Sequence, residues 1–290
     1  NTLKELVLKR NLVIITSFSF ISAFLGLLGC ENDRNIDVIC KNNPELCADL
    51  HRDSWCRFEK GDLVRHRLVL KEADTPSGKQ LFQQLIYLEK YSNCIELAAG
   101  VQHILNPERT QDRQRAYAVS TQTLSELQEY TKDNPDIYLA YYRWLRFNDK
   151  PSQYLVIEAY QQGNVSDPQI LNQLVSYYVR VSPDEAKRIY LGLFSTTSFE
   201  NFNADWLLGV ASVFQQQQHF ENVYLFTKAN TLLTENQVNE EQLLSLIGGN
   251  HDLAKQLDQQ AHIFINDLKS GNFANSASAA LLLTPENIKD

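Results

Sequence analysis

Five cysteines are the side chains in this sequence best able to do chemistry, and all five lie in the first third of the chain. A thiol can carry a lipid, pair in a disulfide or bind a metal ion. Which of these applies depends on the redox state of the compartment. The segment that precedes Cys30, the first of the five, carries the information about that compartment.

Residues 1–30 have the layout of a secretory signal. Three basic residues within the first ten precede residues 11–30, which contain no charge, and this order is typical of a signal peptide. Leu27-Leu28-Gly29-Cys30 resembles the lipobox of bacterial lipoproteins, which implies removal of residues 1–29 and acylation of Cys30. An uncleaved anchor is the alternative, because about 20 apolar residues can span a bilayer. Both interpretations place the remaining chain outside the cytoplasm.

The residue after Cys30 bears on the choice of membrane. It is Glu31, not the aspartate that the lipoprotein resemblance associates with retention at the inner membrane. The resemblance therefore implies attachment to the outer membrane of a Gram-negative bacterium, facing the periplasm. Apart from the covalent lipid on Cys30, we expect no cofactor and no metal ion.

The other four cysteines are expected to form two disulfides, for which three connectivities are possible. Residues 55–71 and 79–104 read as helices on either side of a turn at Pro76, with Cys56 20 residues before the proline and Cys94 18 residues after it. At ~1.5 Å per residue the two thiols reach matching depths. This favours Cys56–Cys94, leaving Cys40–Cys47. A zinc site with His51 and His66 is the alternative, although C-x6-C-x8-C is not the usual paired ligand spacing.

No catalytic signature accompanies these cysteines. The sequence has no G-x-S-x-G, no H-E-x-x-H and no glycine-rich phosphate loop, and its six histidines are scattered. We therefore expect no enzyme and no catalytic residue. The alternative is a periplasmic enzyme or small-ligand-binding protein with a pocket between the two helical parts described next.

The elements that position these residues are expected to be helices throughout. Glycine and proline are few, 11 and 8, and successive helix pairs take about 30–35 residues, the scale of helix-hairpin repeats. We expect a lipidated cysteine and tether at 30–39, a disulfide-containing helical cap at 40–106 and an irregular tetratricopeptide- or Sel1-like α-solenoid at 107–290. Residues 203–236, with Trp206 early in the first helix, match such a repeat best. An irregular helical bundle is the alternative.

Two side-chain clusters are candidates for binding. Aromatic residues gather early in the array and could line a partner groove, although an aromatic stripe at helical spacing belongs mostly to the core; they are Tyr138, Tyr141, Tyr142, Trp144 and Tyr154. Basic residues crowd 55–71 and could contact an anionic surface, although a solvated, ion-paired face is favoured; the candidates are Arg57, Arg65 and Arg67.

The charge balance excludes one class of partner. The net charge is −8, and −10 once residues 1–29 are removed with their three basic residues and Glu5. Nucleic-acid binding requires a basic face, so we expect no nucleic-acid partner. The expected partners are the membrane, through the lipid, and another envelope protein.

Two further motifs carry a resemblance to a family. Asn43-Pro44-Glu45-Leu46-Cys47 and Trp55-Cys56-Arg57, together with the lipobox, resemble an uncharacterised family of gammaproteobacterial lipoproteins with a domain of unknown function. The resemblance implies an envelope location and a tetratricopeptide-like helical body, and it transfers no activity. The function expected on these grounds is that of a lipid-anchored adaptor for protein–protein interaction.

Overall fold

The structure is a computed structural model that describes residues 35–283. The expected signal peptide and Cys30 lie outside the described residues. Within them the chain forms thirteen α-helices and three short 3-10 helices, without a strand, so the expected all-α class is confirmed. No helix of the described part is long and apolar enough to cross a bilayer. The chain divides into two compact units, one ending at Arg143 and the other beginning at Trp144.

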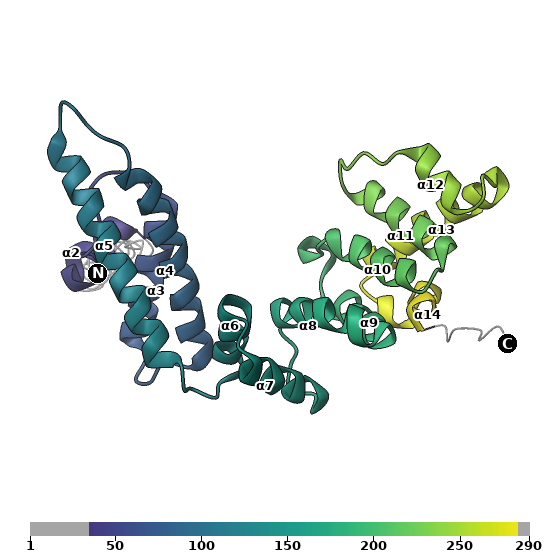
Figure 1. Cartoon of the computed structure of the whole chain (residues 1–290), viewed down its shortest axis with the longest axis horizontal. Coiled ribbons are helices and arrows are strands. Elements are labelled where there is room, and N and C mark those ends of the chain that lie inside the picture. Colours follow the sequence, from purple (N-terminus) through teal and green to yellow (C-terminus); the bar gives the residue numbers. More distant parts are fainter. Residues whose placement is uncertain (1–34, 284–290) are drawn as a thin grey trace, which may run out of the picture. The chain divides into compact units, whose positions relative to one another are not determined.

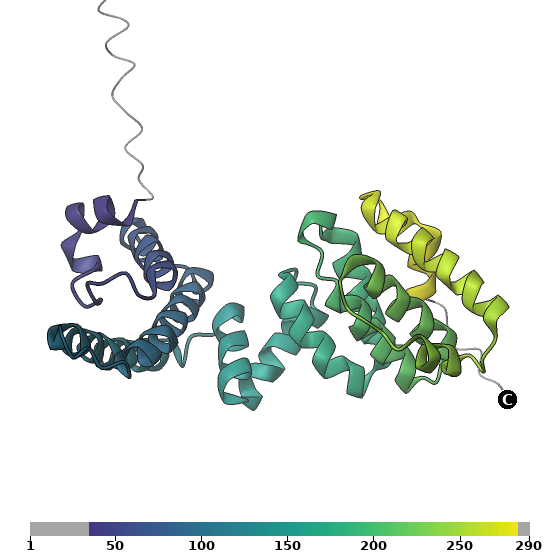
Figure 2. The same ribbon diagram turned by 90° about the horizontal axis from the view of Figure 1, so that it is seen from above.

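The first unit is built on three long helices that lie side by side (Figures 1 and 2). They are α3 (Arg57–Glu72), α4 (Gly78–Ala99) and α5 (Pro107–Thr131). Ser77 begins α4 with a capping box, in which its hydroxyl accepts from Gln80 N and the Gln80 side chain accepts from Ser77 N. The core between these helices includes Leu63, Leu88 and Tyr91, all fully buried.

The first unit opens with α2 (Ile36–Asn42) and η2 (Pro44–Leu46), which pack on α3. The expected tether at 30–39 is therefore helical from Ile36. Asn35 caps α2, and Ile39 is buried. Gly61 of α3 permits the close approach, because a Cβ there would lie 2.7 Å from Ile36 Cδ1. From Pro44 the chain forms only the single turn η2, and Cys47 directly after it bonds back to Cys40.

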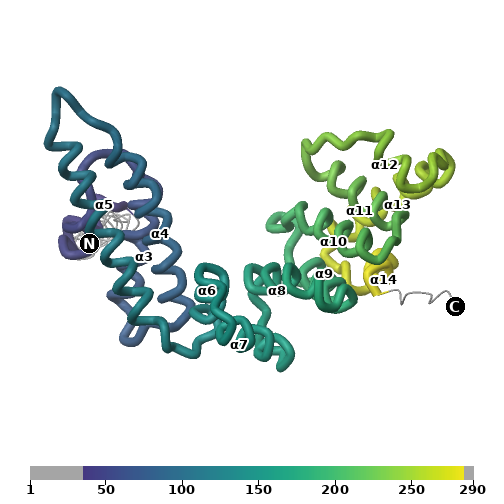
Figure 3. The backbone as a smooth tube through the Cα atoms, viewed as in Figure 1, coloured from purple at the N-terminus to yellow at the C-terminus, as the bar shows by residue number. Residues whose placement is uncertain are grey.

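Both expected disulfides are confirmed. Cys40–Cys47 closes the segment between α2 and η2, and Cys56–Cys94 joins the start of α3 to α4. The limit expected between cap and array, 106/107, falls inside the first unit, because α5 packs along α4. Figure 3 shows the backbone leaving α4, turning through residues 100–106 and returning as α5.

The second unit consists of helix hairpins around an aromatic core. Its helices, after α6 (Ile137–Phe147), which spans the limit between the units, are α7 (Lys150–Gln161), α8 (Pro168–Val181), α9 (Pro183–Thr196), α10 (Asp205–Gln216), α11 (Phe220–Leu233), α12 (Glu240–Leu246), α13 (His251–Lys269) and α14 (Ala277–Leu283), with η3 (Phe199–Asn201) and η4 (Phe273–Asn275) between them. Proline starts several of them, as the sequence predicts. The apolar α14 returns to pack on α9.

Phe194 is the centre of the core of the second unit. Its ring contacts Trp206, Phe264 and Phe273 at centroid distances of 6.4, 6.1 and 5.6 Å. These partners come from α10, α13 and η4, so one side chain of α9 ties together segments that are up to 79 residues apart. The hairpins are thus held by a shared aromatic core, in which edge-to-face pairs add to the apolar burial.

Candidate functional site

A chain of aromatic rings runs across α6, α7 and α8 in the second unit. Trp144 lies 6.5 Å from Tyr177, Tyr177 lies 5.1 Å from Tyr178, and Tyr178 lies 5.8 Å from Tyr160, measured between ring centroids. Trp144 and Tyr178 are buried, so the rings form a rigid base rather than a loose surface cluster. A hollow opens on either side of this base.

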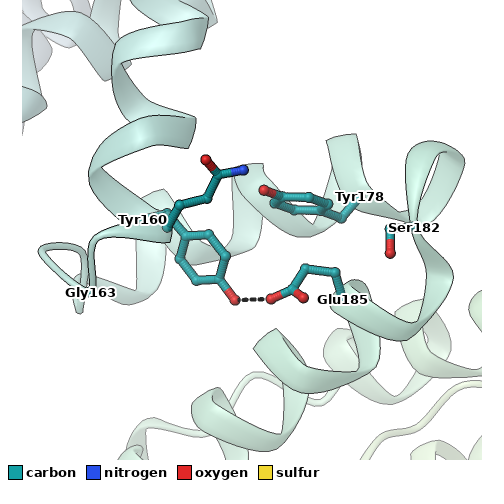
Figure 4. A pocket seen from close by; sticks show the side chains of 6 residues that line it. Tyr160, Gly163, Tyr178, Ser182 and Glu185 are labelled. Carbon is teal, nitrogen blue, oxygen red and sulfur yellow. Dashed lines mark hydrogen bonds between the residues drawn. The ribbon is translucent and has the colours of Figure 1, made fainter.

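The smaller hollow, here the Tyr160 hollow, has a volume of 430 Å³ and is lined by Tyr160, Gln161, Gly163, Tyr178, Ser182 and Glu185. Figure 4 shows Tyr160 and Glu185 pointing toward one another. The Tyr160 hydroxyl donates to Glu185 Oε1 over 2.6 Å, and Glu185 Oε2 also pairs with Arg188 at 2.6 Å.

The polar side chains of the Tyr160 hollow hold two helices together. Burial, followed by the hydrogen bond to Glu185, raises the pKa of Tyr160 well above its usual value. The phenol therefore stays protonated at neutral pH and holds the carboxylate in place. The pair ties the end of α7 to the first turn of α9, and a bound substrate would have to displace it.

The larger hollow, here the Tyr154 groove, has a volume of 730 Å³ and lies between the segment from α6 to α7 and the helix α8. Its lining comprises the aromatic residues Trp144, Tyr154 and Tyr177, the cations Lys150 and Arg180, and the residues Leu145, Asn148, Gln153, Gln173, Ser176 and Val181. No carboxylate is among these lining residues, in a chain whose net charge is −8. The groove thus combines aromatic surface, amides and positive charge.

A tight turn positions one wall of the Tyr154 groove. Asn148 has a φ of 52°, in the left-handed region, which asparagine tolerates better than most residues. Asp149 then caps α7 by accepting from Ser152 N at 2.9 Å. This turn sets Lys150 at the edge of the groove, where its ammonium donates to Gln153 Oε1 at 3.1 Å.

The opposite wall of the groove is one face of α8. Gln173, Tyr177 and Arg180 follow each other at spacings of four and three residues, so they lie on the same side of the helix. The adjacent side of α8 carries Ile170, Leu174 and Tyr178 into the core. The amphipathic pattern of α8 therefore leaves its polar and aromatic side to the groove.

The five aromatic residues named as candidates for a partner groove are divided by the structure. Tyr154 is 67 % exposed and lines the Tyr154 groove, and an edge of the buried Trp144 also reaches it. Tyr138, Tyr141 and Tyr142 instead surround Phe82 of α4 at 6.0, 5.7 and 6.4 Å. Those three belong to the packing of the first unit.

Sequence reasoning missed Lys150 and Arg180 as groove residues, and it did not single out Tyr177 among the tyrosines of the array. The signal for Arg180 was present, because it lies on the side of α8 opposite the apolar stripe, and Tyr177 lies at the edge of that stripe. The signal for Lys150 was its place next to the Asp149 cap and Pro151 at the start of α7. These residues meet only because α7 and α8 lie against one another, and a local sequence pattern does not predict that contact.

The three arginines named as candidates for contact with an anionic surface do not form one patch. Arg67 makes two hydrogen bonds to the Asp49 carboxylate, each 2.7 Å, and a third to Leu46 O. It therefore holds the segment after η2 against α3. Arg65 pairs with Asp62 at 2.6 Å. Arg57 is exposed, with its guanidinium 4.6 Å from the Phe58 ring.

A third hollow, here the cap hollow, lies between α2, the segment 50–54 and the start of α3, with a volume of 680 Å³. Under it His51 is buried and linked to Tyr91: the Tyr91 hydroxyl lies 2.9 Å from Nδ1 and accepts from His51 N at 3.2 Å. His51 Nε2 lies 2.7 Å from Trp55 O. A carbonyl only accepts, so Nε2 carries the proton and Nδ1 accepts from Tyr91.

Burial lowers the pKa of His51, so the ring is neutral at neutral pH and the tautomer just described persists. Burial also raises the pKa of Tyr91 to about 12, so the phenol remains a donor. Both groups therefore act as fixed hydrogen-bonding parts that hold residues 51–55. This arrangement is structural rather than poised for acid–base catalysis.

One cluster has the geometry of a metal site, but two of its three side chains form a disulfide. The ligand atoms of Cys56, Glu59 and Cys94 lie within 4.8 Å of one another. The two sulfurs are bonded to each other, so neither has a thiolate to offer. The zinc alternative, which required free cysteines, does not fit this chain.

The comparisons with known proteins bear on the family alone. The family model described as "Protein of unknown function (DUF2989)" matches residues 27–228. Neither the curated proteins nor the solved structures contain a match. The matched range covers well over half of the chain, takes in Cys30 and all four disulfide cysteines, and extends through the Tyr154 groove. On this match, the chain is a member of the DUF2989 family of proteins of unknown function.

Proposed function

We propose that this protein is a lipid-anchored cell-envelope adaptor of a Gram-negative bacterium and that its Tyr154 groove binds a segment of another envelope protein. The anchor is the lipid on Cys30, at the outer membrane and facing the periplasm. Two disulfides support an oxidising compartment, because such bonds are rare in the cytosol. The uncharged run that ends at Cys30 supports export through the secretory pathway.

The observation that carries the binding role is the composition of the Tyr154 groove. Three aromatic rings and two cations line it without a carboxylate, although acidic residues outnumber basic ones, 35 to 27, in the whole chain. Aromatic and arginine side chains are enriched at protein interfaces and carry much of their binding energy. The chemistry fits an acidic peptide segment with one apolar or aromatic anchor residue.

The scaffold that we propose for this groove is an irregular tetratricopeptide-like array. Hairpins α8/α9 and α10/α11 each pack two helices of 12–14 residues closely against one another, as helix-hairpin repeats do. We further propose that the relatives are gammaproteobacterial lipoproteins with the same body. The return of α14 onto α9 would then be the cap that closes the array.

The experiment is crosslinking in cells, with a photoreactive amino acid at position 154 of the full chain and mass spectrometry of the products. We expect a crosslinked envelope protein whose contact segment is acidic. The substitution Arg180→Glu should reduce the crosslink by about tenfold, because it replaces an attraction by a repulsion at the groove.

A matched control comes from α13, where Lys255 is exposed and remote in sequence from the groove. Lys255→Glu makes the same charge change and should leave the crosslink intact. Equal loss in both variants would show that only net charge matters. A photoproduct with glycan or a small metabolite, and none with protein, would contradict the adaptor role.

A further inference from the structure

One end of the first unit exposes apolar side chains that no other part of residues 35–283 covers. Ile104 and Leu105, in the turn between α4 and α5, are 93 % and 91 % exposed. Leu97, on the last turns of α4, is 75 % exposed, and Phe58, at the start of α3, is 68 % exposed. Large apolar side chains left in water at one end of a folded unit mark a contact surface.

Hydrogen bonds and a ring contact gather these residues at the same end. The Arg113 guanidinium lies 4.8 Å from the Trp55 ring and donates to Ala98 O, which places Trp55 beside the end of α4. Thr110 Oγ1 donates to Val101 O and accepts from His103 N, so the turn folds back on the start of α5. These bonds hold the turn, in which Ile104 and Leu105 are almost fully exposed. Trp55, Phe58, Leu97, Val101, Ile104 and Leu105 are called the apolar end below.

Positive charge lies beside the apolar end. The cap hollow is lined by four cations, Arg52, Arg57, Lys60 and Arg65, and by two carboxylates, Asp37 and Asp53. Asp53 is neutralised by Arg113, whose guanidinium lies 2.7 Å from it. Arg65 is likewise paired with Asp62, so Arg52, Arg57 and Lys60 remain against Asp37, and the hollow has a positive excess in an acidic protein. Arg57, which lines it, stacks on Phe58 of the apolar end.

The length of chain outside the structure limits what can reach this surface. Asn35, the first described residue, lines the same cap hollow as Arg57. Cys30 precedes it by five residues, which can span at most about 17 Å. A lipid on Cys30 would therefore hold the cap hollow next to the bilayer surface.

We propose that the apolar end, together with Arg52 and Arg57 of the cap hollow, docks on the anionic phospholipid bilayer in which the chain is anchored. Ile104, Leu105 and Phe58 enter the headgroup region, Trp55 lies at the interface as tryptophan does in membrane proteins, and Arg52 and Arg57 face the lipid phosphates. The inference rests on the lipid anchor of the proposed function. The docking surface adds a second attachment to the bilayer. With the lipid on Cys30 as the only attachment, the orientation of the cap would not be fixed.

This docking surface differs from the candidate surface on residues 55–71 that the sequence suggested. Of the three arginines singled out there, Arg57 alone belongs to the docking surface, because Arg67 is held by Asp49 and Arg65 by Asp62. Val101, Ile104 and Leu105 of the apolar end come from a turn that the sequence placed inside a helix, 79–104, which ends at Ala99.

The test is the quenching of Trp55 fluorescence by brominated phospholipids, with the full chain reconstituted in vesicles of phosphatidylcholine and phosphatidylglycerol. The variant Trp55→Phe supplies the background of the two buried tryptophans, Trp144 and Trp206. We expect bromolipid to quench the Trp55 component. The double variant Ile104→Ser/Leu105→Ser should lose most of that quenching, and Arg52→Glu/Arg57→Glu should lose its dependence on phosphatidylglycerol.

The control is Leu232→Ser/Ile263→Ser, which removes two exposed apolar residues of the second unit and should leave the quenching unchanged. Flotation of the vesicles reports the anchor separately. Protein that floats while Trp55 stays unquenched overturns the docking and leaves the anchor standing. Protein that does not float overturns the anchor and the docking together, and a protein crosslinked at position 104 in cells would overturn the lipid as occupant.

Discussion

At the scale of single residues, Tyr91 is the most informative hydrogen-bonding group of the first unit. Its hydroxyl serves both the backbone N–H and the ring of the buried His51. The change Tyr91→Phe leaves the ring volume almost unaltered and removes both bonds. Because a buried polar group without a partner costs about 1–3 kcal/mol, we expect the free energy of unfolding to fall by that amount, measured by denaturant titration.

The matched control is Tyr130→Phe on α5, where the ring is 76 % exposed. Water satisfies the hydroxyl there in both the folded and the unfolded chain, so this variant should unfold at the same denaturant concentration as the parent. If Tyr91→Phe also left the free energy of unfolding unchanged, the hydrogen bonds to His51 would not be stabilising residues 51–55.

At the scale of elements, the two disulfides differ in what they constrain. Cys56–Cys94 closes a loop with a sequence separation of 38, and Cys40–Cys47 one of 7. The chain-entropy relation gives losses of about 4 and about 2 kcal/mol on removal. We therefore expect Cys56→Ala/Cys94→Ala to destabilise the first unit roughly twice as much as Cys40→Ala/Cys47→Ala. The reverse order in denaturant titrations would show that α2 contributes more than loop closure suggests.

The helices themselves followed largely from local signals. Asn106-Pro107, Asp167-Pro168 and Ser182-Pro183 stand at the starts of α5, α8 and α9, because proline fits the first turn of a helix. The end of α4 was missed by five residues, since Val101, Ile104 and Leu105 continue an apolar pattern. Exposure of these residues is what a periodicity argument cannot foresee.

The candidate site was only partly predictable, because contacts between residues distant in sequence decide which aromatic side chains line it. Tyr138, Tyr141 and Trp144 occupy neighbouring positions on α6, and nothing local indicates which of them faces Phe82 and which faces α8. Phe82 lies 56 residues before Tyr138, so the choice is made by contacts distant in sequence. Cys56–Cys94 was predictable because both arms of a helical hairpin rise by about 1.5 Å per residue from the turn. Two cysteines at similar numbers of residues from Pro76 therefore lie side by side.

At the scale of the whole molecule, the two units should respond differently to reduction. Both disulfides lie in the first unit, whereas the second is held by the aromatic core around Phe194. Under a reductant that opens both bonds, amide protons of α3, α4 and α5 should exchange with deuterium faster, because the first unit loses its covalent constraints. Those of α10, α11 and α13 should keep their protection. Hydrogen exchange with mass spectrometry measures both regions in one sample. An equal loss of protection in α11 would show that the two units unfold as one, and that the core around Phe194 depends on the disulfides of the other unit.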